Sequence, residues 1–478
     1  MKAPIEASPA NPFLEGPILR SLIKLAIPIV LANLLQTGYQ ITDAFWVGRL
    51  GAAAVAAVSV SFPVMFLMIA IGGGLAVAGA TLIAQYTGAK NQAMVNHVAA
   101  QTMLMVFGVS IILGSIGIAA TPQILRLIGV APEVYAEALG FMRVSFVGLI
   151  FIFSFAMFQA LMRGVGRAMP PLYIVLGTVI LNFALDPIFI FGWGPIPGSG
   201  VMGAAIATLA TQGLATLIAI VLLMRGTYGI AISPKGLAPD FGYIRRAFFL
   251  GFPASIELSA RALGLMILSL LVTSFGTITL AAYGVGSNVL QVVTIPALGL
   301  STAAASLVGQ NIGAGQIERA ARITRLAAAI GFVVLSGVGL LAYAIAPAIV
   351  AFFVPGDPDV IAQGAAFIRT SAPAWGFIAV QLTMVSTFRA SGNMLAAMIL
   401  ALVSQWVLQF PLAYALSRPH VLGATGLWWS FPVTNIVTAA VAYVWYAKGD
   451  WKEQRLTEIS AAQERVMEEV TEDGLPRA

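Results

Sequence analysis

Three acidic residues stand inside long apolar segments of this 478-residue chain: Asp43, Asp186 and Glu257. An ionisable side chain within a hydrocarbon layer costs several kcal/mol, so each of the three is a candidate functional residue. Glu257 precedes Arg261 by four residues, the spacing of an ion pair along one helix, and such a pair is as consistent with a helix anchor as with a functional role. Asp43 and Asp186 are the stronger candidates, because each belongs to a polar stripe.

The two stripes predict one shared site. Side chains three or four residues apart share a helical face, and the first stripe consists of Asn33, Gln36, Tyr39 or Gln40, and Asp43. The second consists of Thr178, Asn182 and Asp186. Each Asp lies five or six residues before the end of its segment, so at about 1.5 Å per residue both carboxyls are expected at one depth. The predicted ion-coupling site comprises Asp43, Asp186, Asn182, Gln36 and Tyr39.

Two buried carboxyls side by side would have a specific chemistry. Burial and a second carboxylate both favour the protonated form, so the pair could carry a proton and change its hydrogen bonds on releasing it. Carboxylate and amide oxygens also suit a sodium ion. Alternatively, the acids only bond to amides and fix helix packing. Pro28 and Pro187 remove helix hydrogen bonds beside these stripes and give their helices places to bend.

The elements that must position these residues are membrane helices. Hydrophobic residues make up 59% of the chain and charged residues 9%, and the apolar segments are too long and continuous for the strands of a membrane barrel. The sequence therefore predicts an all-α integral membrane protein with twelve transmembrane helices. They are expected near 24–47, 53–84, 94–120, 134–162, 170–192, 201–224, 248–274, 278–309, 322–346, 360–388, 395–416 and 424–446.

The chain repeats its landmarks at an offset of 225 or 226 residues. The repeated pairs are Gly51 and Gly276, Gln85 and Gln310, and Arg163 and Arg389. This duplication predicts two pseudo-symmetric six-helix lobes. The acids are not duplicated, since Leu268 and Leu412 take the places that match Asp43 and Asp186.

The predicted domain order is as follows: an N-terminus at 1–23 with an amphipathic lead-in on the membrane surface, a first lobe at 24–224, a linker at 225–247, a second lobe at 248–446, and a tail at 447–478 that forms an amphipathic helix. The connections between spans leave no room for a soluble catalytic domain. No nucleophile and base face each other, so an enzyme is not expected, and two lobes with acids in one of them argue against an axial channel.

The basic residues predict the orientation. With both ends inside, 19 of the 25 Lys and Arg residues fall in inner segments, so both termini are expected to be cytoplasmic, in a plasma or inner membrane. The net charge of +6 follows from this topology and does not indicate nucleic-acid binding. Arg163 and Arg389, at the inner ends of their spans, are expected to extend to the membrane surface. With no cysteine and two isolated histidines, no metal site or organic cofactor is expected.

Other polar and adaptable side chains are candidates for a substrate cavity. Gln159 lies one turn before Arg163, while Met157 and Phe158 could line an adaptable pocket or equally belong to the core. Gln40, Asn33 and Thr178 complete the candidate cavity residues.

Taken together, these segments resemble the multidrug and toxic compound extrusion (MATE) transporters, and within them the DinF-like branch. The resemblance runs from LAIPIVLANLLQTGYQITDAFWVGRLG through ATLIAQYTGAKN, QALMRGVGRAMPP and LNFALDPIFIFG to GFPASIE, SLVGQNIGAG and FRASGN. It implies two six-helix lobes around a central cavity, and a cation-linked site at Asp43, Asn182 and Asp186. The chain departs from members with a second acidic site, because Glu257 follows Pro253 by only four residues and the tenth span has no acid between its ends.

The resemblance implies a secondary active exporter that exchanges protons or sodium ions for amphipathic, often cationic, organic compounds. Its partners would be these small molecules and membrane lipids, and a monomer would suffice. The alternative is a flippase for a lipid or a lipid-linked sugar, which would present a cationic cavity to a phosphate group.

Overall fold

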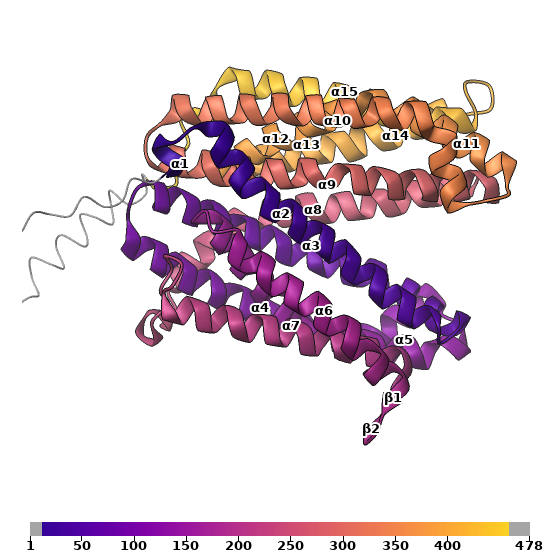
Figure 1. Cartoon of the computed structure of the whole chain (residues 1–478), viewed down its shortest axis with the longest axis horizontal. Coiled ribbons are helices and arrows are strands. Elements are labelled where there is room, and N and C mark those ends of the chain that lie inside the picture. Colours follow the sequence, from indigo (N-terminus) through magenta and orange to yellow (C-terminus); the bar gives the residue numbers. More distant parts are fainter. Residues whose placement is uncertain (1–11, 458–478) are drawn as a thin grey trace, which may run out of the picture.

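The computed structural model describes residues 12–457, which are almost entirely helical (Figure 1). The first half contains α1 (Pro12–Glu15), α2 (Ile18–Gly48), α3 (Ala52–Gly88), α4 (Gln92–Ile128), α5 (Pro132–Gly164), α6 (Met169–Phe191) and α7 (Gly200–Arg225), with a short hairpin of β1 (Gly192–Trp193) and β2 (Ile196–Pro197). The second half contains α8 (Phe241–Thr273), α9 (Thr277–Gly313), α10 (Ile317–Phe353), α11 (Pro358–Ser371), α12 (Trp375–Ser391), α13 (Met394–Leu402), α14 (Phe410–Leu416) and α15 (Ala424–Lys448).

The predicted fold is confirmed, with one span broken in two. Within residues 12–457, 11 helices are long and apolar enough to cross a membrane. The remaining predicted span, 360–388, is divided into α11 and α12 by a 3-10 turn at Ala372–Ala374. Pro373 lies in that turn, and it ends α11 because it lacks an amide hydrogen and its ring crowds the preceding turn. The next span contains a π-helix, Val403–Gln409, between α13 and α14.

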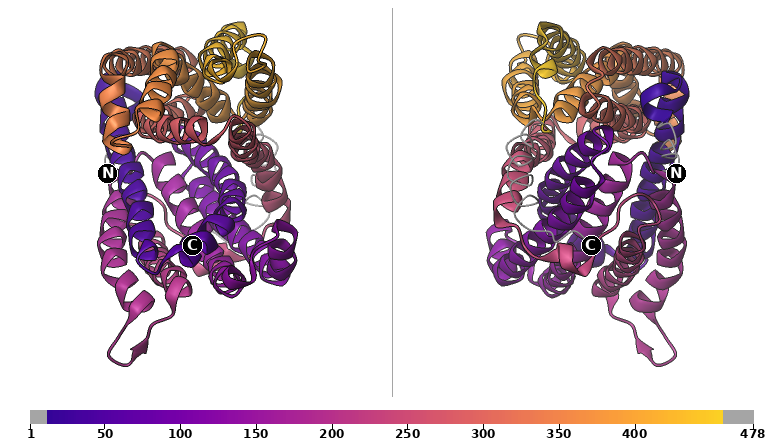
Figure 2. Two further views of the ribbon diagram at one scale, coloured as in Figure 1. Left: turned by 90° about the vertical axis from the view of Figure 1, so that its right-hand side faces the viewer. Right: turned by 90° about the vertical axis from the view of Figure 1, so that its left-hand side faces the viewer.

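The two halves form two lobes, which Figure 2 shows as separate groups of ribbons, indigo to magenta and orange to yellow. The repeat extends to helix starts, since Gly51 and Gly276 open α3 and α9 with φ of 106° and 94°. Such angles favour glycine, which has no Cβ to clash with the backbone. We use the term terminal face for the end of the bundle where the described chain starts and ends, and opposite face for the other end.

Helices α2 and α8 each belong to the cores of both lobes. Leu22 and Ile29, near the start of α2, pack in a hydrophobic cluster with α9, α10, α12 and α15 of the second lobe. Val47, at the other end of α2, packs with α3, α4 and α5. Conversely, Tyr243 near the start of α8 packs in the first-lobe core, and Leu268 packs in the second. The two helices that open the sequence repeats therefore each begin in the core of one lobe and end in the core of the other.

The lobes are joined at the terminal face by two symmetric glutamines, Gln85 of α3 and Gln310 of α9, which we call the glutamine pair. Gln85 Nε2 donates to the carbonyl of Ala390 over 2.8 Å, and Gln310 Nε2 donates to the carbonyl of Gly164 over 2.8 Å. Both glutamine side chains are fully buried. Each bond crosses from one lobe to the C-terminal end of a helix in the other.

Two glycines allow α3 and α9 to meet there. A Cβ on Gly88 would overlap the carbonyl of Gln310, and a Cβ on Gly313 would overlap the carbonyl of Gln85. These close approaches lie next to the terminal face. In Figure 1 the ribbons of the two lobes converge toward this face and diverge toward the opposite face.

The chain ends differ in detail from the predicted segments. Residues 18–23 are the first turns of α2 and not a separate surface helix, and Phe13 of α1 packs in the second-lobe core. Beyond α15, the backbone N–H of Leu456 donates to Gln85 Oε1 over 2.8 Å, so this segment reaches the glutamine pair. The predicted tail helix lies mostly outside the described residues.

The linker between the lobes is shorter than predicted, because α7 ends at Arg225 and α8 already begins at Phe241. It follows the surface of α4. Gln101 Nε2 donates to the carbonyl of Ala238 over 2.9 Å, and Gln101 Oε1 accepts from the backbone N–H of Asp240 over 2.9 Å. These bonds attach the linker to the first lobe.

Candidate functional site: the acid pair of the first lobe

The structure brings Asp43 of α2 and Asp186 of α6 together. Their carboxyls contact each other, and Asp43 also contacts the side chains of Asn182 and Thr208. Asp186 and Asn182 are fully buried, whereas Asp43 is half-buried. Asn182 Nδ2 donates to Asp186 Oδ1 over 3.1 Å. The equal depth expected from the sequence is thus accompanied by direct contact.

The acid pair, Asp43 and Asp186, retains unused acceptors. Asp43 Oδ1 and Asp186 Oδ2 are buried and accept no hydrogen bond from the described residues. Neither carboxyl forms a salt bridge with a basic side chain of residues 12–457. Two ionised carboxyls that face each other in a medium of low dielectric repel each other, and a proton or a cation between them removes that repulsion. The arrangement can therefore bind and release one positive charge.

Helix α7 contributes two threonines that sequence reasoning missed. Thr208 contacts Asp43, and Thr211 Oγ1 lies 2.9 Å from the hydroxyl oxygen of Tyr39. Tyr39 is itself buried at 4% exposure. The signal was present in the run TLATQG, where Thr208, Thr211 and Gln212 are three or four residues apart on one helical face.

Other members of the two stripes lie outside this contact network. Gln36 and Gln40 are exposed, and Asn33 is half-buried. Thr178 is buried, but its hydroxyl donates to the carbonyl of Val175 in its own helix over 3.0 Å. The roles predicted for these four side chains stay predictions.

The residues proposed for a cavity on α5 have mixed positions. Met157 and Phe158 are both 0% exposed and pack in the first-lobe core, where Met157 lies against Gly79 of α3. In this conformation they contribute packing. Gln159 is half-buried, and its Oε1 lies 3.5 Å from Nη1 of Arg163, which gives that arginine a partner toward the middle of the span.

The two prolines lie inside uninterrupted helices. α2 continues through Pro28 and α6 through Pro187. Pro28 lies in the part of α2 that packs in the second lobe, because Ala26 and Ile29 on either side of it belong to the second-lobe cluster. Each proline leaves one carbonyl of the preceding turn without its helix bond, so bending at these positions stays a prediction.

The second lobe holds a charged triad, Glu257, Arg261 and Arg389. Glu257 is fully buried, and its Oε1 lies 2.6 Å from Arg389 Nη2 and 3.2 Å from Arg261 Nη2. Its Oε2 accepts from Arg389 Nε over 3.1 Å. The expectation that Arg389 extends to the membrane surface is wrong, because its guanidinium bonds instead to a carboxylate in the interior. The sequence could not show this pairing, since the two residues lie far apart along the chain.

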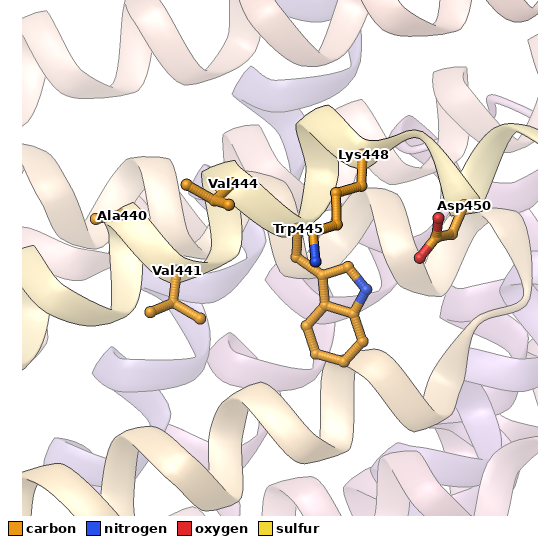
Figure 3. Close-up of a pocket in the computed structure, with 6 residues that line it drawn as sticks. All are labelled: Ala440, Val441, Val444, Trp445, Lys448 and Asp450. Atoms are coloured by element: carbon orange, nitrogen blue, oxygen red, sulfur yellow. The ribbon is translucent and has the colours of Figure 1, made fainter.

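Two hollows elsewhere contain no member of the acid pair. Figure 3 shows one of about 390 Å³ beside the end of α15, lined by Ala440, Val441, Val444, Trp445, Lys448 and Asp450. The other, of about 540 Å³, lies among α3, α4, α8 and the π-helix and is almost entirely apolar.

A duplicated bundle of membrane helices with a buried acid pair in one lobe defines a class of multi-pass membrane transporter. Comparison with protein families agrees: the family model MatE matches residues 28–188 and again 253–415, one match in each lobe. The chain belongs to this family, which consists of transporters and not of enzymes. The MATE resemblance of the sequence is therefore confirmed.

Individual relatives match over nearly their whole lengths. The chain is 27% identical to "Probable multidrug resistance protein YpnP" of Bacillus subtilis (strain 168), over 94% of this chain and 99% of the relative. It is 22% identical to "Multidrug export protein MepA" of Staphylococcus haemolyticus, over 90% and 93%. The fold matches a crystal structure of a MATE protein in complex with MaL6, with a TM-score of 0.86 at 23% identity over 92% and 98%. It also matches an outward-facing multidrug resistance MATE family transporter, with a TM-score of 0.85 at 24% identity over 92% and 97%.

Proposed function

We propose that the protein is a secondary active multidrug exporter that exchanges protons or sodium ions for amphipathic, often cationic, organic compounds. The contact between Asp43 and Asp186 carries this proposal. It provides a buried site of net negative charge whose occupancy by one cation changes the local hydrogen bonds. The names of the relatives, which refer to multidrug resistance and export, support the substrate class.

The site is placed where its occupancy can act on both lobes. Asp43 lies in the half of α2 that packs in the first lobe, and Leu22 lies in the half that packs in the second. A change at Asp43 that draws α2 toward or away from α6 therefore alters the contact between the lobes. Pro28 lies inside α2, in the half that packs in the second lobe, and supplies a place for the helix to bend.

Alternating access also requires the terminal face to open. We infer that this face is cytoplasmic in a plasma or inner membrane, because most basic residues gather there. The glutamine pair holds it closed in this conformation, so its two bonds must break when the cavity turns inward. Substrate and cation would then bind to different conformations with different affinity, which is the condition for exchange.

The test uses the protein reconstituted in lipid vesicles with ethidium as the substrate. A proton gradient and a sodium gradient are imposed separately, and dye export is followed by fluorescence for the wild type and for Asp43→Asn. We expect one gradient to drive export in the wild type and neither to do so in the variant. Asp359→Asn is the matched control, because it makes the same change at an exposed position outside the site. Export by Asp43→Asn at the wild-type rate would refute the proposed role of the acid pair.

A further inference from the structure

The charged triad of the second lobe carries an unbalanced positive charge. Glu257 supplies one negative charge, and Arg261 and Arg389 supply two positive charges. Glu257 is the only acid within salt-bridge distance of either guanidinium among residues 12–457. An uncompensated charge in the interior of a membrane protein is costly unless a counterion or water reaches it.

The hydrogen bonds are unevenly divided within the triad. Arg389 uses two of its nitrogens, Nε and Nη2, on the two oxygens of Glu257. Arg261 uses only Nη2, and its Nε is buried with no partner among the described residues. The side chain of Arg261 is 32% exposed, while Glu257 is 0% exposed. Arg261 therefore offers an accessible guanidinium with donors that Glu257 does not satisfy.

Polar and apolar surfaces adjoin Arg261. One turn along α8, the absence of a Cβ at Gly264 leaves room for the side chain of Gln405. Gln405 belongs to the π-helix, an element that often marks functional sites. On the adjoining face of α8, Ala260 and Leu263 line the apolar pocket of about 540 Å³, together with Trp406 of the π-helix. A cationic group and an apolar pocket thus lie on neighbouring faces of one helix.

We propose that the charged triad binds the anionic head group of an amphiphile, with Arg261 as the contacting residue and the neighbouring pocket holding the apolar chain. The planar fork of a guanidinium matches the oxygens of a carboxylate, sulfonate or phosphate ester. Arg389 stays bonded to Glu257 and positions it, and one anion neutralises the remaining charge. This inference rests on the proposed transport function and adds a second ligand class to it, separate from the cation at the acid pair.

The test compares two probes that share a chain and differ in charge. The purified protein in nanodiscs of phosphatidylcholine is titrated with radiolabelled dodecyl phosphate and with dodecyltrimethylammonium, and binding is measured by scintillation proximity. We expect Arg261→Gln to weaken dodecyl phosphate binding by about tenfold or more, since a charge-assisted hydrogen bond is lost. The affinity for dodecyltrimethylammonium should be unchanged. Arg261→Lys should retain most of the affinity because it keeps the charge.

A matched control and a folding control accompany these titrations. Arg418→Gln removes the same charge from an exposed position of the same lobe, where Arg418 stacks on Tyr414, and should change neither affinity. Arg261→Gln leaves the bonds between Arg389 and Glu257 in place, so a folded protein is expected, which thermal unfolding checks. Absence of dodecyl phosphate binding to the wild type, or equal weakening of both probes by Arg261→Gln, would overturn the proposal.

Two further measurements identify the source of the anion and separate this proposal from the exporter function. Native mass spectrometry after extraction from mixed phosphatidylglycerol and phosphatidylcholine shows whether an anionic lipid is retained through Arg261. If no lipid is retained while dodecyl phosphate binds, the ligand is a free amphiphile. Asp43→Asn should bind dodecyl phosphate normally although it does not export. Failure of the binding test therefore leaves gradient-driven ethidium export intact, and the reverse also holds.

Discussion

The two lobes share a fold but hold opposite charges. In the first lobe, Asp43 and Asp186 face each other with no basic partner among the described residues. In the second, Glu257 is held between two arginines. The helices, the glutamine pair and the positions of Arg163 and Arg389 are repeated between the halves, whereas the buried acids stand at positions that do not match. We infer that the shared helices let the lobes move against each other, while the unequal charges let them bind different ligands.

The largest effect is expected from substitutions in the acid pair of the first lobe. Asp186→Asn should abolish gradient-driven ethidium export as completely as Asp43→Asn, because the two carboxyls bind the cation as one unit. The double variant should then be no worse than either single one. Vesicle transport assays of the three proteins check this. Substantial export by either single variant would show that one carboxyl suffices.

The next largest effect is expected on stability, from a substitution in the charged triad of the second lobe. Glu257→Gln leaves two guanidinium groups without their buried acceptor, and removing one partner of a buried ion pair costs about 3 to 5 kcal/mol of stability. We expect a lower thermal unfolding temperature in detergent. Glu133→Gln, at an exposed position near the start of α5, is the control and should change it little. An unchanged unfolding temperature for Glu257→Gln would mean that the triad does not stabilise the lobe.

A double variant sharpens the same result. Adding Arg389→Gln to Glu257→Gln removes one of the two unpaired charges, so part of the lost stability should return. Additive destabilisation would show instead that Arg389 acts independently of Glu257. The comparison measures how strongly the two bonds between these side chains couple α8 to α12.

A smaller effect concerns the feature that the lobes share. Gln85→Ala with Gln310→Ala removes two hydrogen bonds across the terminal face, each contributing about 1 kcal/mol, so the open form should gain about thirtyfold in population. The chain has no cysteine, so spin labels can be attached uniquely to cysteines that replace Arg225 and Lys448. Pulsed electron resonance should then show longer distances. Gln123→Ala, at an exposed position, is the control.

The smallest effect tests the support that α7 gives to α2. Thr211→Val keeps the shape of the side chain but removes its contact with the Tyr39 hydroxyl, which contributes about 1 kcal/mol. We expect export to fall by about fivefold and not to be lost. Tyr39→Phe removes the same contact from the other side and should give a similar result. A complete loss would place Tyr39 among the residues that bind the cation.

Much of the fold could be predicted because apolar length and repeat spacing are local properties. Continuous apolar segments predicted the twelve spans, and residues such as Gly51 and Gly276 predicted the repeat. The break at Pro373 was missed, because a proline within an apolar segment can bend, kink or end a helix depending on what packs around it. The sharing of α2 and α8 between lobes was also missed, since it reflects helix packing and not chain order.

The sequence by itself was enough to predict that carboxyls lie within the membrane spans and that Asp43 and Asp186 share a depth, because helical rise and periodicity convert residue spacing into position. Only the tertiary structure decided which groups meet. It joined Thr208 to the acid pair and turned Arg389 inward to Glu257, although each partner stands on a different helix. The physical reason is that a buried charge is stabilised by whatever partner packing brings within a few ångströms, and that partner need not be near in the chain.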